Sequence, residues 1–338
     1  MTQTENYINK AEVQPLVTVI IMSYNQDSYI EQAITSVIEQ TYKNIEIIIS
    51  DNGSTDKSKS IIQKFLSDPR VKFLDYSENG FITKRQNVAA HQASGEFISL
   101  LYGDDYYLPS KISNQVEAFR NLDETWGVVH CPGYILTKSG SKELDSEIVS
   151  ANGFCLQELL DCKRGFINPI SPLVRASCYK KYLSYEEIFT EGEGLFYKFA
   201  LEYKFYYQQN PEVVMRYHDK NMGKAIIKNN KIYVYCLERL KSFKKFPSNL
   251  ISNANHAIAF QQYNTAITLV KYLHAEIDEI SELTKSVYRL DKRKIFSLPG
   301  ILLAIITLMP MTLTKCIFSI LRKIFPQNYA PILDDYYS

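Results

Sequence analysis

Two adjacent carboxylates, Asp104 and Asp105, follow an apolar run in the segment "EFISLLYGDDYYLP". Like charges side by side repel, so this placement favours a positively charged ligand, and carboxylate oxygens are what hard divalent cations prefer. Gly103 allows the chain to bend just before the pair, so that one acid can face a metal ion and the other a ribose or sugar. The plainer interpretation is a solvated turn whose acids favour the N-terminus of a helix beginning near Pro109.

Two further polar clusters suit the same chemistry, "SYNQD" from Ser23 and "DNGSTD" from Asp51. Tyr24 offers a flat face for a nucleotide base, and Asp51 offers a carboxylate that accepts a hydrogen bond from an imide N–H or a ribose hydroxyl. Bare carboxylates would repel a diphosphate, whereas a divalent cation between the two attracts both. Taken alone, Asp51-Asn52-Gly53 is an ordinary turn, and Tyr24 is equally a packing residue at a helix entry.

The elements that must position these clusters alternate between strand and helix. Four apolar runs are typical of strands covered on both faces: Val17–Met22, Ile45–Ser50, Val71–Tyr76 and Glu96–Leu101. Helical patterns separate them, with a capping box from Ser28 to Glu31, Ser54 or Thr55 as the second cap, and a third helix from Lys84 to Ala93. This order predicts an α/β fold with a doubly wound, mainly parallel, Rossmann-like sheet. Ligands of such sheets bind beyond the carboxyl ends of the strands, where all three clusters fall.

The composition narrows the class of protein. The chain has 338 residues, of which 46% are hydrophobic and 22% charged, which is typical of a globular protein. A net charge of +1 provides no broad basic field for nucleic acid. The six cysteines include no Cys-x-x-Cys pair, which favours reduced cytosolic thiols, and the polar N-terminus lacks the apolar core of a signal peptide.

Several motifs together resemble the family 2 glycosyltransferases, inverting enzymes of the GT-A fold. They are "VTVIIMSYNQ", "SVIEQTYKNIEIIISDNGSTD" and "NVAAHQASGEFISLLYGDDYYLP", in that order, and the likeness extends from Val17 to Ala118. The resemblance implies a nucleotide-sugar donor, usually with uridine diphosphate, and a Mg²⁺ or Mn²⁺ ion. By matched position Tyr24 is the base-stacking aromatic residue and Asp51 the base-binding carboxylate. Asp104 and Asp105 are the last two acids of the family's Asp-x-Asp-Asp stretch, with Asp105 as the main metal ligand.

This chain departs from the family pattern at two of these motifs. Tyr102 stands where the family has its first acid, so the ion has fewer protein ligands. The arginine of the family's Ala-Arg-Asn is missing or shifted to Arg85, a candidate donor-binding residue, with Lys84 as a second substitute.

The second half is expected to bind the acceptor, beginning with a strand from Gly127 to Leu136. The segment "TEGEGLFYKFALEYKFYYQQ" resembles the family's acidic pair, one of which is the base that deprotonates the acceptor hydroxyl. Glu191 matches the first acid, Gly192 stands at the usual aspartate, and Glu193 follows, so either glutamate is a candidate base. Both could instead favour a helix N-terminus.

The segment "MRYHDKN" resembles the family's closing basic-aromatic stretch. Arg216, His218 or Lys220 could neutralise the leaving diphosphate, and we select His218 as a donor-binding residue. The alternative for His218 is a plain surface or hydrogen-bonded histidine.

We divide the chain by expected role into residues 15–125 for the nucleotide sugar, 126–224 for the acceptor, 225–295 as a helical appendage and 296–325 as a membrane-associating segment. No charge occurs from Phe296 to Thr314, but Pro299 and Pro310 interrupt the run. Basic residues flank it on both sides, which favours helices lying on an anionic membrane over a spanning helix. A buried oligomer interface is the alternative.

The sequence therefore predicts an inverting glycosyltransferase that moves a sugar from a UDP-sugar to a cell-surface polysaccharide or lipid-linked glycan, from the cytoplasmic side at the inner face of the membrane. The second hypothesis is a non-catalytic module, derived from such a transferase, that holds a nucleotide sugar or a partner. A nucleotidyltransferase is a third, but no glycine-rich phosphate loop with Lys or Arg follows the first strand.

Overall fold

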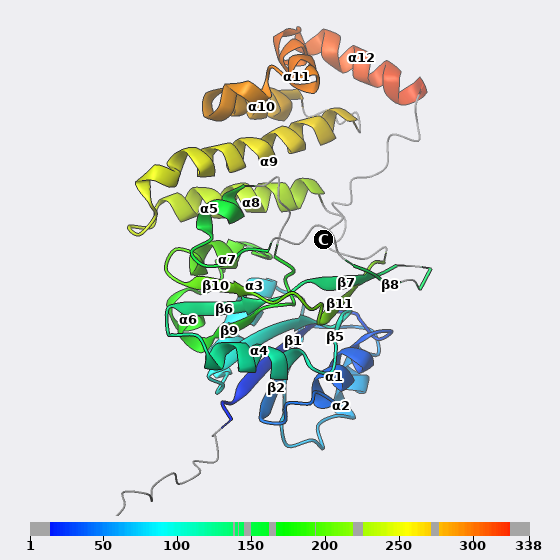
Figure 1. Ribbon diagram of the computed structural model, residues 1–338. Helices are drawn as coiled ribbons and strands as arrows, with labels where there is room; N and C mark the ends of the chain where they lie inside the picture. The colour runs from blue at the N-terminus through cyan, green and yellow to red at the C-terminus, as the bar shows by residue number, and fades with distance from the viewer. Residues whose placement is uncertain are drawn as a thin grey trace, which may run out of the picture. The chain divides into compact units, whose positions relative to one another are not determined.

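The structure is a computed structural model. It describes residues 14–137, 139–140, 142–144, 150–161, 167–192, 194–218, 226–271 and 277–324 (Figure 1). Contacts between Cα atoms divide the chain into two units. Unit 1 contains Met1–Tyr134, Asn168–Ser184 and Tyr206–Met215, and unit 2 contains the remainder, Ile135–Ile167, Tyr185–Phe205 and Arg216–Ser338.

Unit 1 holds the strands and helices that the sequence predicts over residues 17–101, followed by further elements. They are β1 (Val17–Ser23), α1 (Ile30–Ile38), β2 (Ile45–Asp51), α2 (Ser58–Gln63), β3 (Val71–Asp75), α3 (Ile82–Gln92), β4 (Phe97–Tyr102), β5 (Tyr106–Tyr107), α4 (Lys111–Arg120), β6 (Trp126–His130), β9 (Leu173–Arg175) and α6 (Ala176–Lys181). Three strands start in one unit and end in the other: β7 (Gly133–Leu136), β10 (Lys204–Tyr207) and β11 (Val213–Arg216).

The large sheet of unit 1 has the order β6-β9-β4-β1-β2-β3, and β10 follows β6. β1 pairs in parallel with β2 and β4, and β2 pairs in parallel with β3, whereas β9 runs antiparallel to β4 and β6. The predicted mainly parallel α/β sheet is thereby confirmed. From β1 the chain winds first toward β3 and then back to β4, so the switch point where ligands bind lies between the ends of β1 and β4.

The sheet is apolar along its inner strands because helices cover both faces. On one face Val19 and Ile21 of β1 pack in a single cluster with Ile34 of α1 and Ile112 of α4. The alternate residues, such as Ile20, point to the opposite face, and α3 packs against β1 and β2. This core fixes the ends of β1, β2 and β4, from which the candidate site is built.

Two predicted helix caps are wrong. α1 begins at Ile30 without a side-chain cap, and the Ser28 hydroxyl donates instead to Asp27 Oδ1 at 3.2 Å. α2 begins only at Ser58, whose amide donates to Asp56 Oδ1 at 2.9 Å. Ser54 and Thr55, the expected caps of α2, instead contact Asp51 and Asn25 at the ends of β2 and β1, as described below.

The predicted strand from Gly127 to Leu136 is two strands, β6 and β7, interrupted at Cys131 and Pro132. Proline has no amide hydrogen to donate to a ladder, so a strand commonly breaks there.

Unit 2 is mainly helical, which confirms the predicted C-terminal helical region. Its elements are β8 (Lys142–Leu144), α5 (Leu156–Leu160), α7 (Gly194–Phe199), α8 (Ile226–Lys241), η2 (Ser248–Leu250), α9 (Ile251–Lys271), α10 (Ile277–Asp291), η3 (Lys292–Lys294), α11 (Leu298–Leu308) and α12 (Met311–Ile324). Leu269 of α9, Ile280 of α10 and Leu303 and Ile306 of α11 share one small core. Within the described residues, no helix is both long enough and apolar enough to cross a membrane.

Candidate functional site

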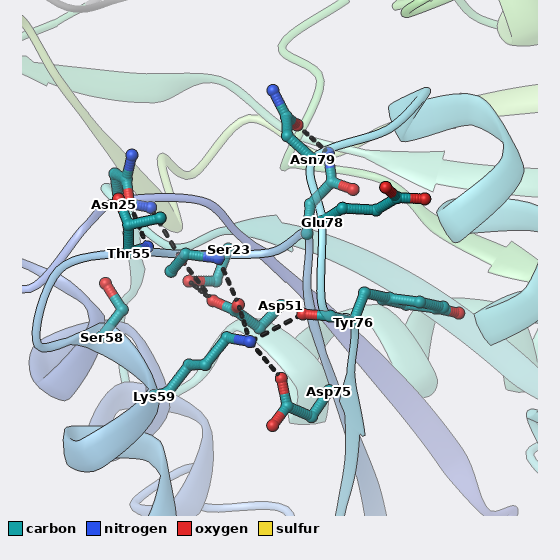
Figure 2. A network of polar contacts seen from close by, with 12 residues as sticks. Ser23, Asn25, Asp51, Thr55, Ser58, Lys59, Asp75, Tyr76, Glu78 and Asn79 are labelled. Atoms are coloured by element: carbon teal, nitrogen blue, oxygen red, sulfur yellow. Dashed lines mark hydrogen bonds and ion pairs between the residues drawn. The ribbon is translucent and has the colours of Figure 1, made fainter.

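The loop after β1 is tied to the loop after β2 through its own backbone amides. Three successive amides donate to side chains of the second loop: Asn25 to Ser54 Oγ at 2.8 Å, Gln26 to Ser58 Oγ at 2.8 Å and Asp27 to Asp56 Oδ2 at 3.0 Å. Asn25 has a left-handed backbone with φ of 51°, and its Oδ1 accepts from the Thr55 amide at 2.8 Å (Figure 2). These amides are committed within the protein, so they do not form the open cradle of a phosphate-binding loop.

Asp51, at the end of β2, is fully buried beneath this loop. Its Oδ1 accepts from the Ser54 amide at 2.8 Å, and its Oδ2 accepts from the hydroxyls of Ser54 at 2.6 Å and Ser23 at 3.1 Å. The carboxylate therefore holds the ends of β1 and β2 in one arrangement (Figure 2). Its assignment to the nucleotide base stays a prediction, since both of its oxygens already accept hydrogen bonds from the protein.

Lys59 of α2 provides the positive charge beside Asp51. Its Nζ lies 4.0 Å from Asp51 Oδ1 and 2.5 Å from Asp75 Oδ1, and it donates to the Tyr76 carbonyl at 2.6 Å. Lys59 thus connects α2 to the end of β3 (Figure 2). A role for Lys59 was not predicted, because a lone lysine in a helix usually lies on a solvated face.

Arg85 of α3 lies over the loop that follows β3. Its guanidinium carbon is 3.6 Å from the centroid of the Tyr76 ring, and its Nε donates to Asn52 Oδ1 at 3.2 Å. The Asn52 amide nitrogen donates to the Gly80 carbonyl at 2.8 Å, so Asn52 joins this loop to the end of β2. Lys84, the other candidate, is exposed and lies 5.7 Å from the Phe81 ring centroid. Of the two, Arg85 is the one placed among the strand ends.

The Gly103-Asp104-Asp105 turn closes the other side of the switch point. The Gly103 amide donates to the Met22 carbonyl of β1 at 2.8 Å, and the Asp105 amide donates to the Tyr102 carbonyl at 3.0 Å. Asp105 is buried and Asp104 is half-buried. A Cβ at Gly103 would lie 2.2 Å from Gln26 Oε1 and 2.9 Å from Ile30 Cδ1, so a larger residue here would require those side chains to shift.

The donor atoms around this turn fit a divalent cation. Gln26 Oε1 is buried, has no hydrogen-bond partner among the described residues, and lies against Gly103, the residue that precedes the two aspartates. Carboxylate and amide oxygens are hard ligands, and Mg²⁺ commonly binds through one or two carboxylates together with substrate phosphates. Among the described residues no group of three or more His, Cys, Asp and Glu side chains converges on one point. Asp104 and Asp105 are the carboxylates at this turn that would hold such an ion together with a diphosphate.

Tyr24 directly follows β1 and is partly exposed. It lies next to Ser23, whose hydroxyl is one of the donors to Asp51. The structure thus places Tyr24, Asp51, Arg85, Asp104 and Asp105 in unit 1, at the carboxyl ends of its parallel strands or at the start of the helix that follows β3.

The candidate base Glu191 lies in unit 2 and is buried in an ion pair. Its Oε1 is 2.7 Å from Lys198 Nζ, and its Oε2 accepts from Lys198 at 3.0 Å and from the Tyr185 amide at 2.8 Å. Burial lowers the pKa of Lys198, and the neighbouring Glu191 carboxylate opposes that effect. Gly192 has a φ of 53°, a left-handed backbone that glycine adopts without strain.

The other second-half candidates are described only in part. Glu193 and Lys220 lie outside the described residues. Arg216 is the last residue of β11, and His218 follows it two residues later, half-buried, in unit 2. Their assignment to the donor diphosphate stays a prediction.

Sequence reasoning missed the residues that fasten the two loops together. The sequence predicts Ser54 as a helix cap and Ser58 as a helix residue, and it does not show that both accept hydrogen bonds from the β1 loop. Lys111 was also missed, although it lies only six residues after Asp105.

Comparisons with known proteins find glycosyltransferases. Residues 18–162 match the family described as glycosyl transferase family 2. An uncharacterized glycosyltransferase of Rickettsia typhi is 32% identical over 212 residues, which cover 61% of this chain and 65% of the relative. An Escherichia coli protein named UDP-Glc:alpha-D-GlcNAc-diphosphoundecaprenol beta-1,3-glucosyltransferase WfaP is 41% identical over 101 residues, covering 30% of this chain and 40% of that protein. The chain spans 36% of the length of a Rickettsia conorii relative.

Solved structures share the fold at low sequence identity. S. aureus TarS residues 1–349 in complex with UDP-GlcNAc superposes with a TM-score of 0.65 at 14% identity, covering 91% of this chain and 92% of that one. The mannosyltransferase PcManGT of Pyrobaculum calidifontis, in complex with GDP-Man and Mn²⁺, gives a TM-score of 0.56 at 15% identity, covering 94% and 89%. Residues 18–162 of this chain therefore match the model of glycosyl transferase family 2, and the chain shares its α/β fold with TarS.

Proposed function

We propose that this protein is an inverting glycosyltransferase that moves a hexosyl or N-acetylhexosaminyl group from a UDP-sugar to a hydroxyl of a polysaccharide or lipid-linked glycan. The observation that carries the proposal is the Asp104–Asp105 turn, which lies at the switch point between β1 and β4 within a segment of glycosyltransferase family 2. Tyr24, Asp51 and Arg85 lie at neighbouring strand ends, where a nucleotide would bind.

A diphosphate at this switch point needs positive charge, and the β1 loop does not supply it. The amides of Asn25, Gln26 and Asp27 are occupied by protein side chains. Asp105, with Asp104 beside it, would hold a Mg²⁺ or Mn²⁺ ion, and the bound ion would neutralise the diphosphate of the donor and of the leaving UDP. A Mn²⁺ complex of a protein with the same fold is consistent with this choice.

The roles of the nucleotide-binding residues follow from their burial. Tyr24 is accessible enough to stack on a base, and Arg85 is held over Tyr76 beside Asn52. Asp51 would act by holding the ends of β1 and β2 in place. A direct contact between Asp51 and the base would require it to exchange one of its present hydrogen bonds. His218 and Arg216 are the candidates for neutralising the charge of the leaving diphosphate.

Inverting transfer requires a base that takes the proton from the acceptor hydroxyl as its oxygen attacks the anomeric carbon from the face opposite the diphosphate. We assign this role to the Glu191–Glu193 segment. The Lys198 ion pair keeps Glu191 buried, so proton transfer from an acceptor to Glu191 would require that pair to loosen. Glu193 carries the role if Glu191 is only structural.

The acceptor is a hydroxyl-bearing glycan, and a lipid-linked one is favoured. The E. coli relative is named for a GlcNAc-diphosphoundecaprenol acceptor. Attachment of the C-terminal helices to the cytoplasmic face of the cell membrane would bring the site to such a lipid, while the donor arrives from the cytosol.

The α11–α12 region has the surface that such attachment needs. Leu303 and Ile306 of α11 are buried in the core of unit 2, whereas the large apolar side chains Ile301, Leu302, Ile305 and Leu308 of the same helix are exposed. Leu313, Ile317 and Ile320 of α12 are exposed as well. Residues 292–324 contain six Lys or Arg residues and no Asp or Glu, which complements an anionic lipid surface.

Liposome sedimentation tests this attachment. Leu308, which is 84% exposed, is replaced by glutamate, and the matched control is Phe154→Glu, another exposed apolar residue of unit 2. The wild type and the control are expected to pellet with anionic vesicles and to be released by salt, and Leu308→Glu to pellet less. Equal pelleting of all three, or concentration-dependent self-association without lipid binding, would favour an oligomer interface.

A non-catalytic nucleotide-sugar-binding module remains a second candidate, because Tyr102 and Gly192 replace two family acids. A UDP-release assay with a panel of UDP-sugars, Mn²⁺ and lipid-linked acceptors separates the two. Acceptor-dependent UDP release supports the transferase. Tight binding of a UDP-sugar without release under any acceptor supports the module.

A further inference from the structure

Lys111, the first residue of α4, is fully buried in unit 1. Its Nζ donates to Ser99 Oγ of β4 and lies 4.2 Å from the centroid of the Tyr107 ring of β5. This hydrogen bond is made to a neutral hydroxyl rather than to a carboxylate.

Such a lysine is unfavourable for stability. Burial lowers the pKa of Lys111 to about 7, although the nearby Cys131 and Glu212 oppose the effect. A buried ammonium without a paired carboxylate loses solvation that a hydroxyl and a ring do not fully replace. Methionine would fill nearly the same space without that penalty, so stability alone gives no reason for lysine here.

The contacts of Lys111 close the base of one particular loop. The Tyr107 hydroxyl donates to the Leu100 carbonyl at 2.6 Å and lies 2.9 Å from Ser99 Oγ. β4 and β5 are therefore fastened together on either side of residues 101–106, and these residues include the Gly103-Asp104-Asp105 turn. The Lys111 amino group links β4 to β5, since it contacts Ser99 on β4 and Tyr107 on β5.

We propose that Lys111 is a positioning residue for this turn: it fastens β5 to β4 so that Asp104 and Asp105 are held in one arrangement toward a divalent cation and a diphosphate. The inference rests on the proposed function for its purpose. The fastening itself does not depend on any ligand, which allows the two to be tested separately.

The test compares Lys111→Met with the wild type and with Lys64→Met, a lysine on the surface after α2. The first measurement is amide hydrogen exchange of the metal-free protein. The amides of Gly103, Asp105 and Leu108 are hydrogen-bonded to Met22, Tyr102 and Glu212 carbonyls, so exchange reports directly on the turn. We expect faster exchange confined to peptides covering residues 101–108, with a Tm that is unchanged or higher.

The second measurement is calorimetric binding of UDP in the presence of Mn²⁺. We expect Lys111→Met to weaken it by roughly 10–100-fold, the range for residues that orient metal ligands. Lys64→Met is expected to match the wild type in both measurements. Asp105→Asn, measured in parallel, reports on the metal site itself.

Three results would overturn the inference. If hydrogen exchange and UDP binding equal those of the wild type, Lys111 does not hold the turn. If the Tm is lower and exchange is faster across unit 1, Lys111 is a general packing residue. A local exchange increase with unchanged UDP binding would show that the fastening does not serve the ligand. If the wild type binds no UDP with Mn²⁺, the proposed function fails, and the exchange result alone decides whether Lys111 holds the turn.

Discussion

Among the described residues two lysines are buried, one in each unit, and their surroundings differ. Lys198 of unit 2 has both oxygens of Glu191 within 3.0 Å, whereas Lys111 of unit 1 has a serine hydroxyl and a tyrosine ring. Burial lowers the pKa of both amino groups, to about 7 for Lys111. The Lys198 pair is self-contained, so its loss is expected to show in stability. The Lys111 contacts converge beside a candidate ligand turn, so their loss is expected to show in binding.

The largest effect is expected from breaking the Glu191–Lys198 pair. Glu191→Gln leaves the Lys198 ammonium buried without its carboxylate, and removing one partner of a buried pair typically costs about 3–5 kcal/mol. Urea unfolding measures the loss, with the exposed Glu187→Gln as control. The double variant Glu191→Gln/Lys198→Met should recover much of it. A loss below about 1 kcal/mol would contradict the ion pair.

Activity separates the two candidate bases once stability is known. Replacing the true base by glutamine is expected to lower turnover by roughly 10²–10⁴-fold while UDP binding persists. If Glu193→Gln shows this loss at wild-type stability, Glu191 is a structural residue. If only Glu191→Gln shows it, and the double variant regains stability without activity, Glu191 is the base. Near wild-type turnover in both single variants would place the base elsewhere.

For Lys111, by contrast, we predict that the free energy of unfolding depends on pH. Its pKa is about 7 in the folded chain and near 10.5 when unfolded, so between these values the unfolded state binds more protons and the wild type gains stability as pH rises. The slope from this group is at most about 1.4 kcal/mol per pH unit. The stability advantage of Lys111→Met should therefore shrink from pH 7 to pH 9.5. A difference that stays constant over this range would show that Lys111 does not titrate there.

The smallest effect is expected at Lys59, whose partner Asp75 is 45% exposed. Asp75→Asn should change the unfolding free energy by about 1 kcal/mol or less, because exposed ion pairs are screened by water. The result is checked by urea unfolding at low and high salt. If Asp75→Asn lowers the unfolding free energy as much as Glu191→Gln, exposure does not decide how much each lysine's ion pair contributes to stability.

The fold was predictable because its determinants are local. Continuous apolar runs gave β1, β2 and β4 within one residue of their observed ends, and the same runs placed Asp51 and the Asp104–Asp105 pair at strand ends. The helix starts were wrong because Ser28, Ser54 and Thr55 have side chains that cap helices in many proteins, whereas here they are used between loops or locally. Local spacing cannot distinguish those partners.

The arrangement within the site was less predictable for a similar reason. Nothing near Asp51 in sequence indicates that Ser23, 28 residues away, would donate to it, or that it would be fully buried. Likewise Lys111 is read as a helix-surface residue from its type, and only the side-chain contacts of the following segment with β4 reveal that Ser99 and Tyr107 surround it. Contacts between distant strands, rather than residue types, decide these roles.

The most direct test of the central claim is calorimetric titration of the full chain with UDP, with Mn²⁺ and after its removal by EDTA, for the wild type and Asp105→Asn. We expect the wild type to bind UDP only when Mn²⁺ is present, and Asp105→Asn to lose this metal-dependent binding at an unchanged Tm. UDP binding of equal strength with and without the metal, or equal binding by both proteins, would contradict it.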